Sequence, residues 1–204
     1  MEDLEVMGNG VQFFSVALLF VTGTGILLMD DWRWKTGLLG LQYIGVFSLV
    51  SASWPVDIAV VKLVAGWMAA AVLFRTSANV SSTVAEPYRP LSSPDIFFRG
   101  FTAILIGLSV YSLVPGALRW FLGATSQQAL GGLLLLGLGL LQLGLSREGI
   151  RIVIGLLTVI SGFEILYATL EASVLMTGLL ALLTITIAFV GAYLLLASSL
   201  EEIR

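Results

Sequence analysis

Two ionisable residues stand inside long apolar stretches of this sequence, and they are the first candidates for chemistry. Lys62 lies in the stretch from Pro55 to Phe74, and Glu164 lies in the stretch from Ile150 to Leu170. Each is about seven residues from one end of its stretch, which is roughly 10 Å along a helix at 1.5 Å per residue. At the centre of a membrane a charged side chain costs on the order of 2.5–3.5 kcal/mol, so ionisable residues inside a span are functional candidates.

Three interpretations of these two residues stay open. In the first, Lys62 and Glu164 face each other inside a helix bundle and form a proton or ion relay, in which each group alters the proton affinity of the other. In the second, they form a purely structural ion pair. In the third they do not touch, because the lysine extends to the interface and the glutamate is neutral.

Other kinds of chemistry find little support in the sequence. The chain has no cysteine and no histidine, which excludes disulfides and the common zinc, iron–sulfur and haem sites. No Ser–His–Asp set, phosphate-binding glycine loop or hydrolytic carboxylate pair is present. We therefore expect no cofactor and no enzyme activity of the chain by itself; an enzyme acting on lipids would lack a catalytic constellation. No basic tract points to nucleic acid.

The elements that must position Lys62 and Glu164 are predicted to be membrane helices. Of the 204 residues 58% are hydrophobic and 11% are charged, whereas a soluble domain has about 25% charged residues. Seven stretches have the length needed to cross a bilayer, and the predicted fold is an all-α bundle of seven transmembrane helices. The stretches are Val11 to Met29, Gly37 to Ser53, Pro55 to Phe74, Ile96 to Val114, Gln128 to Leu145, Ile150 to Leu170 and Val174 to Ala197.

The lysines and arginines predict the orientation of this bundle. If all seven stretches cross, Arg119 is the only basic residue in a loop on the side of the N-terminus, and Lys62 lies inside a stretch. The other basic residues fall on the opposite side, which is the cytoplasmic one by the positive-inside rule. The N-terminus is therefore expected outside and the C-terminus in the cytoplasm.

The connectors predict how the chain divides. The segment 75–95 is rich in Ser and Pro, and we expect a cytoplasmic connector without regular structure there. It separates a three-helix unit at 1–74 from a fourth helix and outer loop at 96–127. The remaining part, 128–204, forms a second three-helix unit. Pro115 and Gly116 are expected to end the fourth helix.

Several further residues have expected roles in packing. Gln42 and Gln142 could join helices through hydrogen bonds, and Trp67 is expected to pack between helices. The glycine pairs Gly132–Gly139 and Gly155–Gly162 are each two helical turns apart, so they would allow two helices to approach closely. Asp30, Asp31, Arg33 and Lys35 are expected to form a solvated loop.

The run from Leu143 to Gly155, LGLSREGIRIVIG, resembles the cytoplasmic loop and following helix of the small K-type subunit of respiratory complex I. It is similar as well to the C subunit of multi-subunit cation/proton antiporters. The whole chain resembles the E component of membrane-bound hydrogenases related to formate hydrogenlyase. The segments 32–37 and 60–64, with a basic loop before a glycine and a lysine in an apolar run, extend this likeness to the first half.

The resemblance implies a small membrane subunit of an ion-translocating complex of the complex I, hydrogenase and antiporter superfamily. Such a subunit would be a non-catalytic part of an oxidoreductase complex in a prokaryotic cytoplasmic membrane, beside a large antiporter-like subunit. It would act as a scaffold or as a modified proton relay through Lys62 and Glu164. Arg147 and Arg151 would hold the cytoplasmic loop against anionic lipid or a neighbouring subunit.

The sequence departs from that family at its proton-carrying positions. Where the family has a glutamate in the sixth helix this chain has Ile160, followed by the matching Gly162, and Glu164 lies one helical turn beyond Ile160. The last helix has acidic residues only at Glu201 and Glu202. The alternative function is therefore a stand-alone small transporter, or another homo-oligomeric membrane protein without partner subunits.

Overall fold

The structure is a computed structural model that describes residues 2–83, 93–121, 123–146, 148–171 and 173–202. These residues form an all-helical bundle, so the predicted fold class is confirmed in its coarse form. The described helices are α1 (Glu2–Leu28), α2 (Trp32–Val50), α3 (Val56–Thr83), α4 (Ser93–Trp120), α5 (Ser126–Leu145), α6 (Gly149–Ala168) and α7 (Val174–Glu202).

Within the described residues, six helices are long and apolar enough to cross a membrane. The helix that falls short is α2, because Arg33 and Lys35 lie in its first turn and Gln42 lies near its middle. This helix packs against α1, α3 and α6. Lys35 and Gln42 lie on its buried face, whereas Leu41 and Ile44 on the opposite face are exposed. A face that meets other helices tolerates polar side chains that a lipid-facing surface would not.

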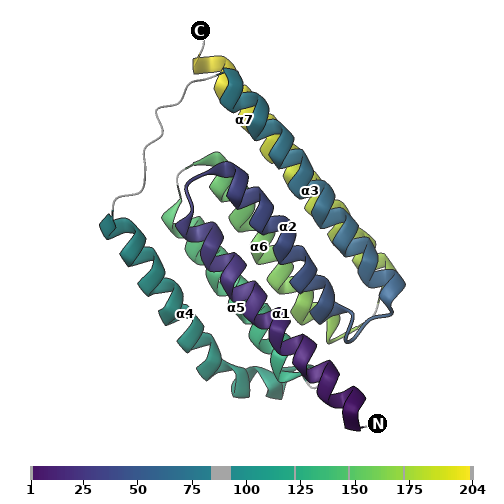
Figure 1. The fold of residues 1–204 in the computed structure, drawn as a ribbon. Coiled ribbons are helices and arrows are strands. Elements are labelled where there is room, and N and C mark those ends of the chain that lie inside the picture. The colour runs from purple at the N-terminus through teal and green to yellow at the C-terminus, as the bar shows by residue number, and fades with distance from the viewer. Residues whose placement is uncertain (1, 84–92, 122, 147, 172, 203–204) are drawn as a thin grey trace.

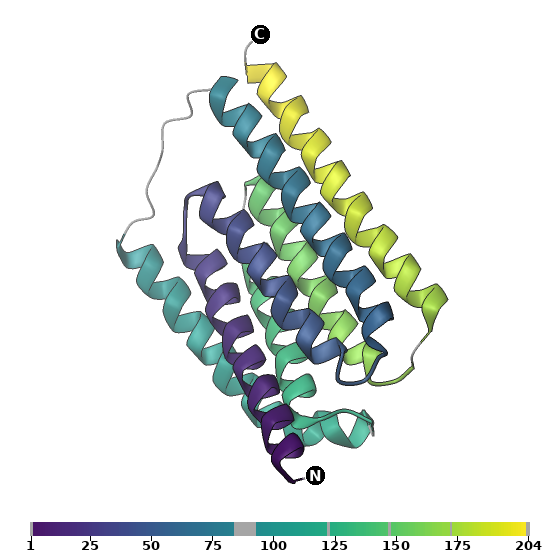
Figure 2. The same cartoon turned by 45° about the vertical axis from the view of Figure 1, so that its right-hand side comes forward.

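Successive helices run up and down through the bundle (Figure 1), and the two ends of the chain lie at opposite ends of it. In the turned view, α3 and α7 lie side by side along one flank, while α4 lies on the opposite flank (Figure 2). The outward faces of α4 and α7 are apolar, with Leu108 and Leu175 among their exposed side chains. Apolar surface of this kind indicates contact with a lipid bilayer.

Helices α3 and α4 extend well beyond the ends that the sequence predicts for them. The expected connector 75–95 is helical at both ends, since α3 continues to Thr83 and α4 begins at Ser93, and its middle part, 84–92, lies outside the described residues. Here α3 packs along α7, and Thr76 and Ser77 are buried. Tertiary packing thus overrides a composition that disfavours helix.

The expected helical end at Pro115 is also wrong, since α4 continues through this residue to Trp120. The proline removes one backbone hydrogen bond, which bends a helix without ending it, and Figure 2 shows the last turns of α4 bending away from its first part.

The glycine pairs bring α5 and α6 into backbone contact, as predicted. A Cβ atom added at Gly162 would lie 2.7 Å from the carbonyl oxygen of Gly132 and 2.7 Å from the amide nitrogen of Leu136. A Cβ added at Gly139 would lie 3.0 Å from the carbonyl oxygen of Gly155. Real side chains do not fit at such distances, so these glycines set the separation of the two helices.

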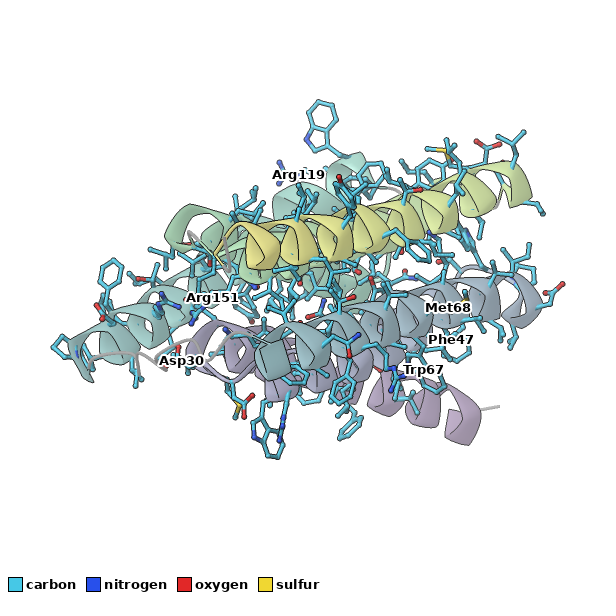
Figure 3. All side chains as sticks on the ribbon, turned by 90° about the horizontal axis from the view of Figure 1, so that it is seen from above. Asp30, Phe47, Trp67, Met68, Arg119 and Arg151 are labelled. Atoms are coloured by element: carbon cyan, nitrogen blue, oxygen red, sulfur yellow. The ribbon has the colours of Figure 1, made fainter. Side chains whose placement is uncertain are left out.

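Trp67 does not pack between helices, contrary to the prediction. Its side chain is half-exposed (Figure 3), and its indole N–H donates to the carbonyl oxygen of Gly40 at 3.1 Å. A tryptophan that is polar at one edge can satisfy its donor on a neighbouring helix while its ring faces the surroundings.

Candidate functional site

The two ionisable residues inside the apolar stretches are in contact. The ammonium of Lys62, on α3, donates a hydrogen bond to Oε1 of Glu164, on α6, and the two groups form an ion pair. Lys62 is 3% exposed and Glu164 is 2% exposed. The predicted juxtaposition is therefore present, and the third interpretation, in which the side chains do not touch, is wrong.

The local sequence of α6 places Glu164 on a polar face of an otherwise apolar helix. Thr158, Ser161 and Glu164 follow at spacings of three residues, which keeps them on one side of the helix. The hydroxyls of Thr158 and Ser161 donate to the carbonyl oxygens one turn before them, at 2.9 Å each. Their oxygens still have acceptor capacity, so this face can receive hydrogen bonds from α2 and α3.

The polar face of α6 meets two polar side chains of α2. The Gln42 amide donates to the Thr158 hydroxyl at 3.4 Å, which joins α2 to α6 as predicted. Tyr43 is buried beside Gly66 of α3, where an added Cβ would overlap its ring. Gly66 is one turn after Lys62, so the absence of a side chain there lets the tyrosine lie close to the ion pair.

Two buried polar atoms on α2 lack a hydrogen-bond partner within the described part of the chain. They are the amide oxygen of Gln42 and the hydroxyl of Tyr43. The Tyr43 side chain lies near Ser161 and Glu164, but its hydroxyl bonds to neither of them. Buried polar atoms are nearly always satisfied, by protein or by ordered water. These two atoms therefore mark places along the polar face of α6 where internal water would be stabilised.

A second cluster of charges lies at the end of the bundle that holds the α1–α2 and α5–α6 loops. We call this the charged end, defined by Asp30, Lys35, Glu148 and Arg151. The guanidinium of Arg151 contacts Asp30 at 2.6 Å and Glu148 at 2.6 Å, and the Lys35 ammonium lies 3.9 Å from Glu148. Figure 3 shows Asp30 and Arg151 side by side. Gln142 adds a bond from its amide to the carbonyl oxygen of Arg151 at 3.1 Å, as expected of a helix-joining residue.

Two sequence-based expectations for this end are wrong. Lys35 is 1% exposed and Asp30 is paired with Arg151, so these residues do not form a solvated loop. Arg151 is 6% exposed, which does not fit contact with lipid or with a neighbouring subunit. Instead it ties α6 to the loop between α1 and α2. Arg147, which shared that expected role, lies outside the described residues.

Lys35 has an altered proton affinity. It precedes the apolar stretch that begins at Gly37, and its burial lowers the pKa to about 8 from the usual 10.5, with a further contribution from Arg151. Glu148 and Asp30 act in the opposite direction. Because the folded state holds this proton less tightly than the unfolded state, the group lowers stability below pH 8 and this loss disappears as the pH rises to about 10.5.

We therefore expect the free energy of unfolding of the protein to rise between pH 8 and pH 10 by on the order of 2 kcal/mol through this lysine. Thermal unfolding of the purified protein in detergent at several pH values measures this change. The variant Lys35→Met has no group to titrate and should show a flatter profile over the same range. Identical profiles for the two proteins would contradict the prediction.

The opposite end of the bundle holds a shallow, open pocket of about 390 Å³. We call this the pocket end. The pocket is lined by Ala52, Ser53, Gly123, Ala168, Thr169, Leu170 and Glu171. The buried Trp54 indole donates to the Glu171 carbonyl oxygen at 3.1 Å, and the Gln128 amide donates to the Ser53 hydroxyl at 2.7 Å. The first bond joins the α2–α3 loop to the α6–α7 loop, and the second joins the α2–α3 loop to the first turn of α5.

Sequence reasoning missed several polar residues of the site. Tyr43, Thr158 and Ser161 lie along the buried polar face, and Thr184 of α7 lies beside Glu164. The spacing of Thr158, Ser161 and Glu164 is a signal that could have been found. Ile160, at the position of the family glutamate, is only partly buried. Among the described residues, no group of three or more acidic, histidine or cysteine side chains could hold a metal ion.

Comparisons with protein-family profiles, with curated proteins and with solved structures found no match to this chain. The resemblance stated above therefore rests on the sequence motifs alone.

Proposed function

We propose that this chain is a membrane subunit of an ion-translocating complex, in which the Lys62–Glu164 pair takes up and releases a proton. The observation that supports this proposal is the ion pair itself, buried between α3 and α6. Removing two charges from water costs several kcal/mol per ion, so a hydrophobic pair would serve a purely structural purpose at least as well. Ionisable groups inside membrane bundles are typical of proton pathways.

The surroundings of the pair support proton exchange. Tyr43, Ser161 and Thr184 supply hydroxyl groups near Glu164. When Glu164 accepts a proton the Lys62 ammonium loses its counter-charge, and the pair re-forms when the proton leaves. A buried ammonium without a counter-charge is unfavourable. Protonated Glu164 therefore tends to release its proton again, so the exchange is reversible.

In this proposal α2 crosses the membrane with the six longer helices, and the charged end faces the cytoplasm. Arg33, Lys35, Arg99 and Arg151 lie near that end, whereas Arg119 lies in the last turn of α4, at the pocket end. This asymmetry is that of the positive-inside rule. The sequence resemblance favours a prokaryotic cytoplasmic membrane and a large antiporter-like subunit as partner, with the chain itself non-catalytic.

The proposal is tested by purifying the chain from its native membrane in mild detergent and reconstituting the purified assembly in liposomes. A pH-sensitive dye inside the liposomes reports proton uptake under an imposed membrane potential. The variant Glu164→Gln should lower uptake by about tenfold or more, equivalent to at least 1.4 kcal/mol of barrier. The amide oxygen can still accept the hydrogen bond from Lys62, so the same subunits should co-purify.

The matched control is Asp57→Asn, which removes an exposed carboxylate from the first turn of α3. Its proton uptake should equal that of the unaltered protein. Unchanged uptake in the Glu164→Gln assembly would leave only the scaffold role. If no other subunit co-purifies and uptake still depends on Glu164, the chain is instead a stand-alone transporter.

A further inference from the structure

The ion pair lies much closer to the pocket end than to the charged end. Ala168, which lines the pocket, is one helical turn after Glu164 on α6, and both residues are buried. The four residues from Glu164 to Ala168 correspond to about 6 Å along the helix axis. The pocket is open and its lining includes Ser53, Thr169 and Glu171, so water that enters it lies about one helical turn from Glu164.

Toward the charged end the polar face of α6 continues for only part of the distance. Thr158, bonded to Gln42 of α2, lies about 9 Å from Glu164 along the helix axis, and Arg151 lies about 20 Å away. The remaining distance, between Thr158 and Arg151, includes Ile154. Opposite it on α2, Leu39 lies between Lys35 and Gln42.

Leu39 and Ile154 form a buried apolar layer across this gap. Both are 0% exposed, and they belong to one hydrophobic cluster together with Leu157 and Val153. The polar atoms on the two sides of the layer are not joined to one another by any hydrogen bond found within the described residues. Apolar constrictions of this kind stop the passage of ions and water by dewetting.

From this geometry we infer that Glu164 exchanges its proton with water at the pocket end, and that Leu39 and Ile154 form the barrier that separates the ion pair from the charged end. The inference rests on the proposed function and specifies the side from which the pair is loaded. The proton passes from a hydronium ion in the pocket to the Glu164 carboxylate and returns to water there while the apolar layer is closed.

The access half of the inference is tested by thiol labelling, because the chain has no cysteine of its own. Ala52→Cys and Thr169→Cys place a thiol in the pocket, where neither residue is buried, and Ala69→Cys places one in the same buried cluster as Leu39. A membrane-impermeant methanethiosulfonate reagent with a quaternary ammonium group is added in turn to each side of sealed vesicles. A tag on the N-terminus, which lies at the pocket end in Figure 1, identifies the two sides.

The two pocket variants should react only from the side of the N-terminal tag, and Ala69→Cys should react from neither side. Reaction of the pocket thiols from the opposite side, or from no side, would overturn the inferred access. This measurement does not depend on transport. Labelling as expected together with unchanged uptake in Glu164→Gln would therefore refute the proposed function and leave the access geometry intact.

The barrier half is tested by changing Ile154 in the reconstituted assembly. Ile154→Ser places a hydroxyl between Thr158 and Arg151, and it should raise passive proton leak by about tenfold, a fall of roughly 1.4 kcal/mol in the barrier. The matched control Ile154→Val keeps the layer apolar and should leave the leak unchanged. The double variant Ile154→Ser/Glu164→Gln should lose the added leak.

An unchanged leak in Ile154→Ser, measured on protein whose thermal unfolding shows that it is folded, would overturn the role of Ile154 in the barrier. Leu39→Ser supplies the second test of the same layer from α2, and it should raise the leak in the same way. A leak that persists in the double variant would overturn the path through Glu164.

Discussion

Replacement of Lys62 by methionine is expected to destabilise the protein by about 3–5 kcal/mol. Methionine has a similar length and removes only the charge, so Glu164 is left buried without its partner. A carboxylate in that position must either remain charged in an apolar interior or take up a proton at a cost in free energy. Unfolding of the purified protein in detergent, followed by its helical signal, measures the loss.

The double variant Lys62→Met/Glu164→Leu distinguishes the effect of losing the whole ion pair from the effect of leaving one charge without its partner. It removes both charges and leaves an apolar contact between α3 and α6, so its stability should return close to that of the unaltered protein. Stability would then be restored while proton uptake stays low, because no carboxylate remains. A cost of less than about 1 kcal/mol for Lys62→Met alone would show that water screens the pair.

The variant Gly162→Ala is expected to destabilise the bundle by about 3 kcal/mol, near the upper limit for overpacking a core. The added methyl group would meet two backbone atoms of α5, and a backbone cannot rotate away as a side chain can. The two helices must therefore separate, which disturbs the helix that positions Glu164. The same unfolding measurement in detergent gives the magnitude.

Gly178→Ala is the matched control, because Gly178 lies in α7 with nothing within 4 Å of an added Cβ. There the substitution should be neutral or stabilising by about 0.5–1 kcal/mol, since alanine is the better helix former. Equal effects of the two substitutions would show that helix propensity, and not close packing of α5 against α6, determines the response.

The Lys62–Glu164 ion pair and the charged end differ in how far the sequence could predict them. Lys62 and Glu164 stand out because each is a lone charge in a long apolar stretch, and matching depths suggest that they meet. Arg151 and Lys35 stand at the edges of apolar stretches, where charges usually face water or lipid headgroups. Whether such a residue turns inward depends on neighbours from distant parts of the chain, as Asp30 and Arg151 show.

The amino-acid sequence by itself determined the apolar lengths, the helical class, the asymmetry of basic residues and the glycine pairs, because these follow from composition and local spacing. Only the tertiary structure decided which face of α2 is buried, that α4 continues through Pro115, and that Lys35 is buried. It also decided that Tyr43 and Gln42 lie beside the polar face of α6. These features depend on which helices become neighbours, and a side chain's surroundings in a bundle are set by packing between helices that are far apart in the chain.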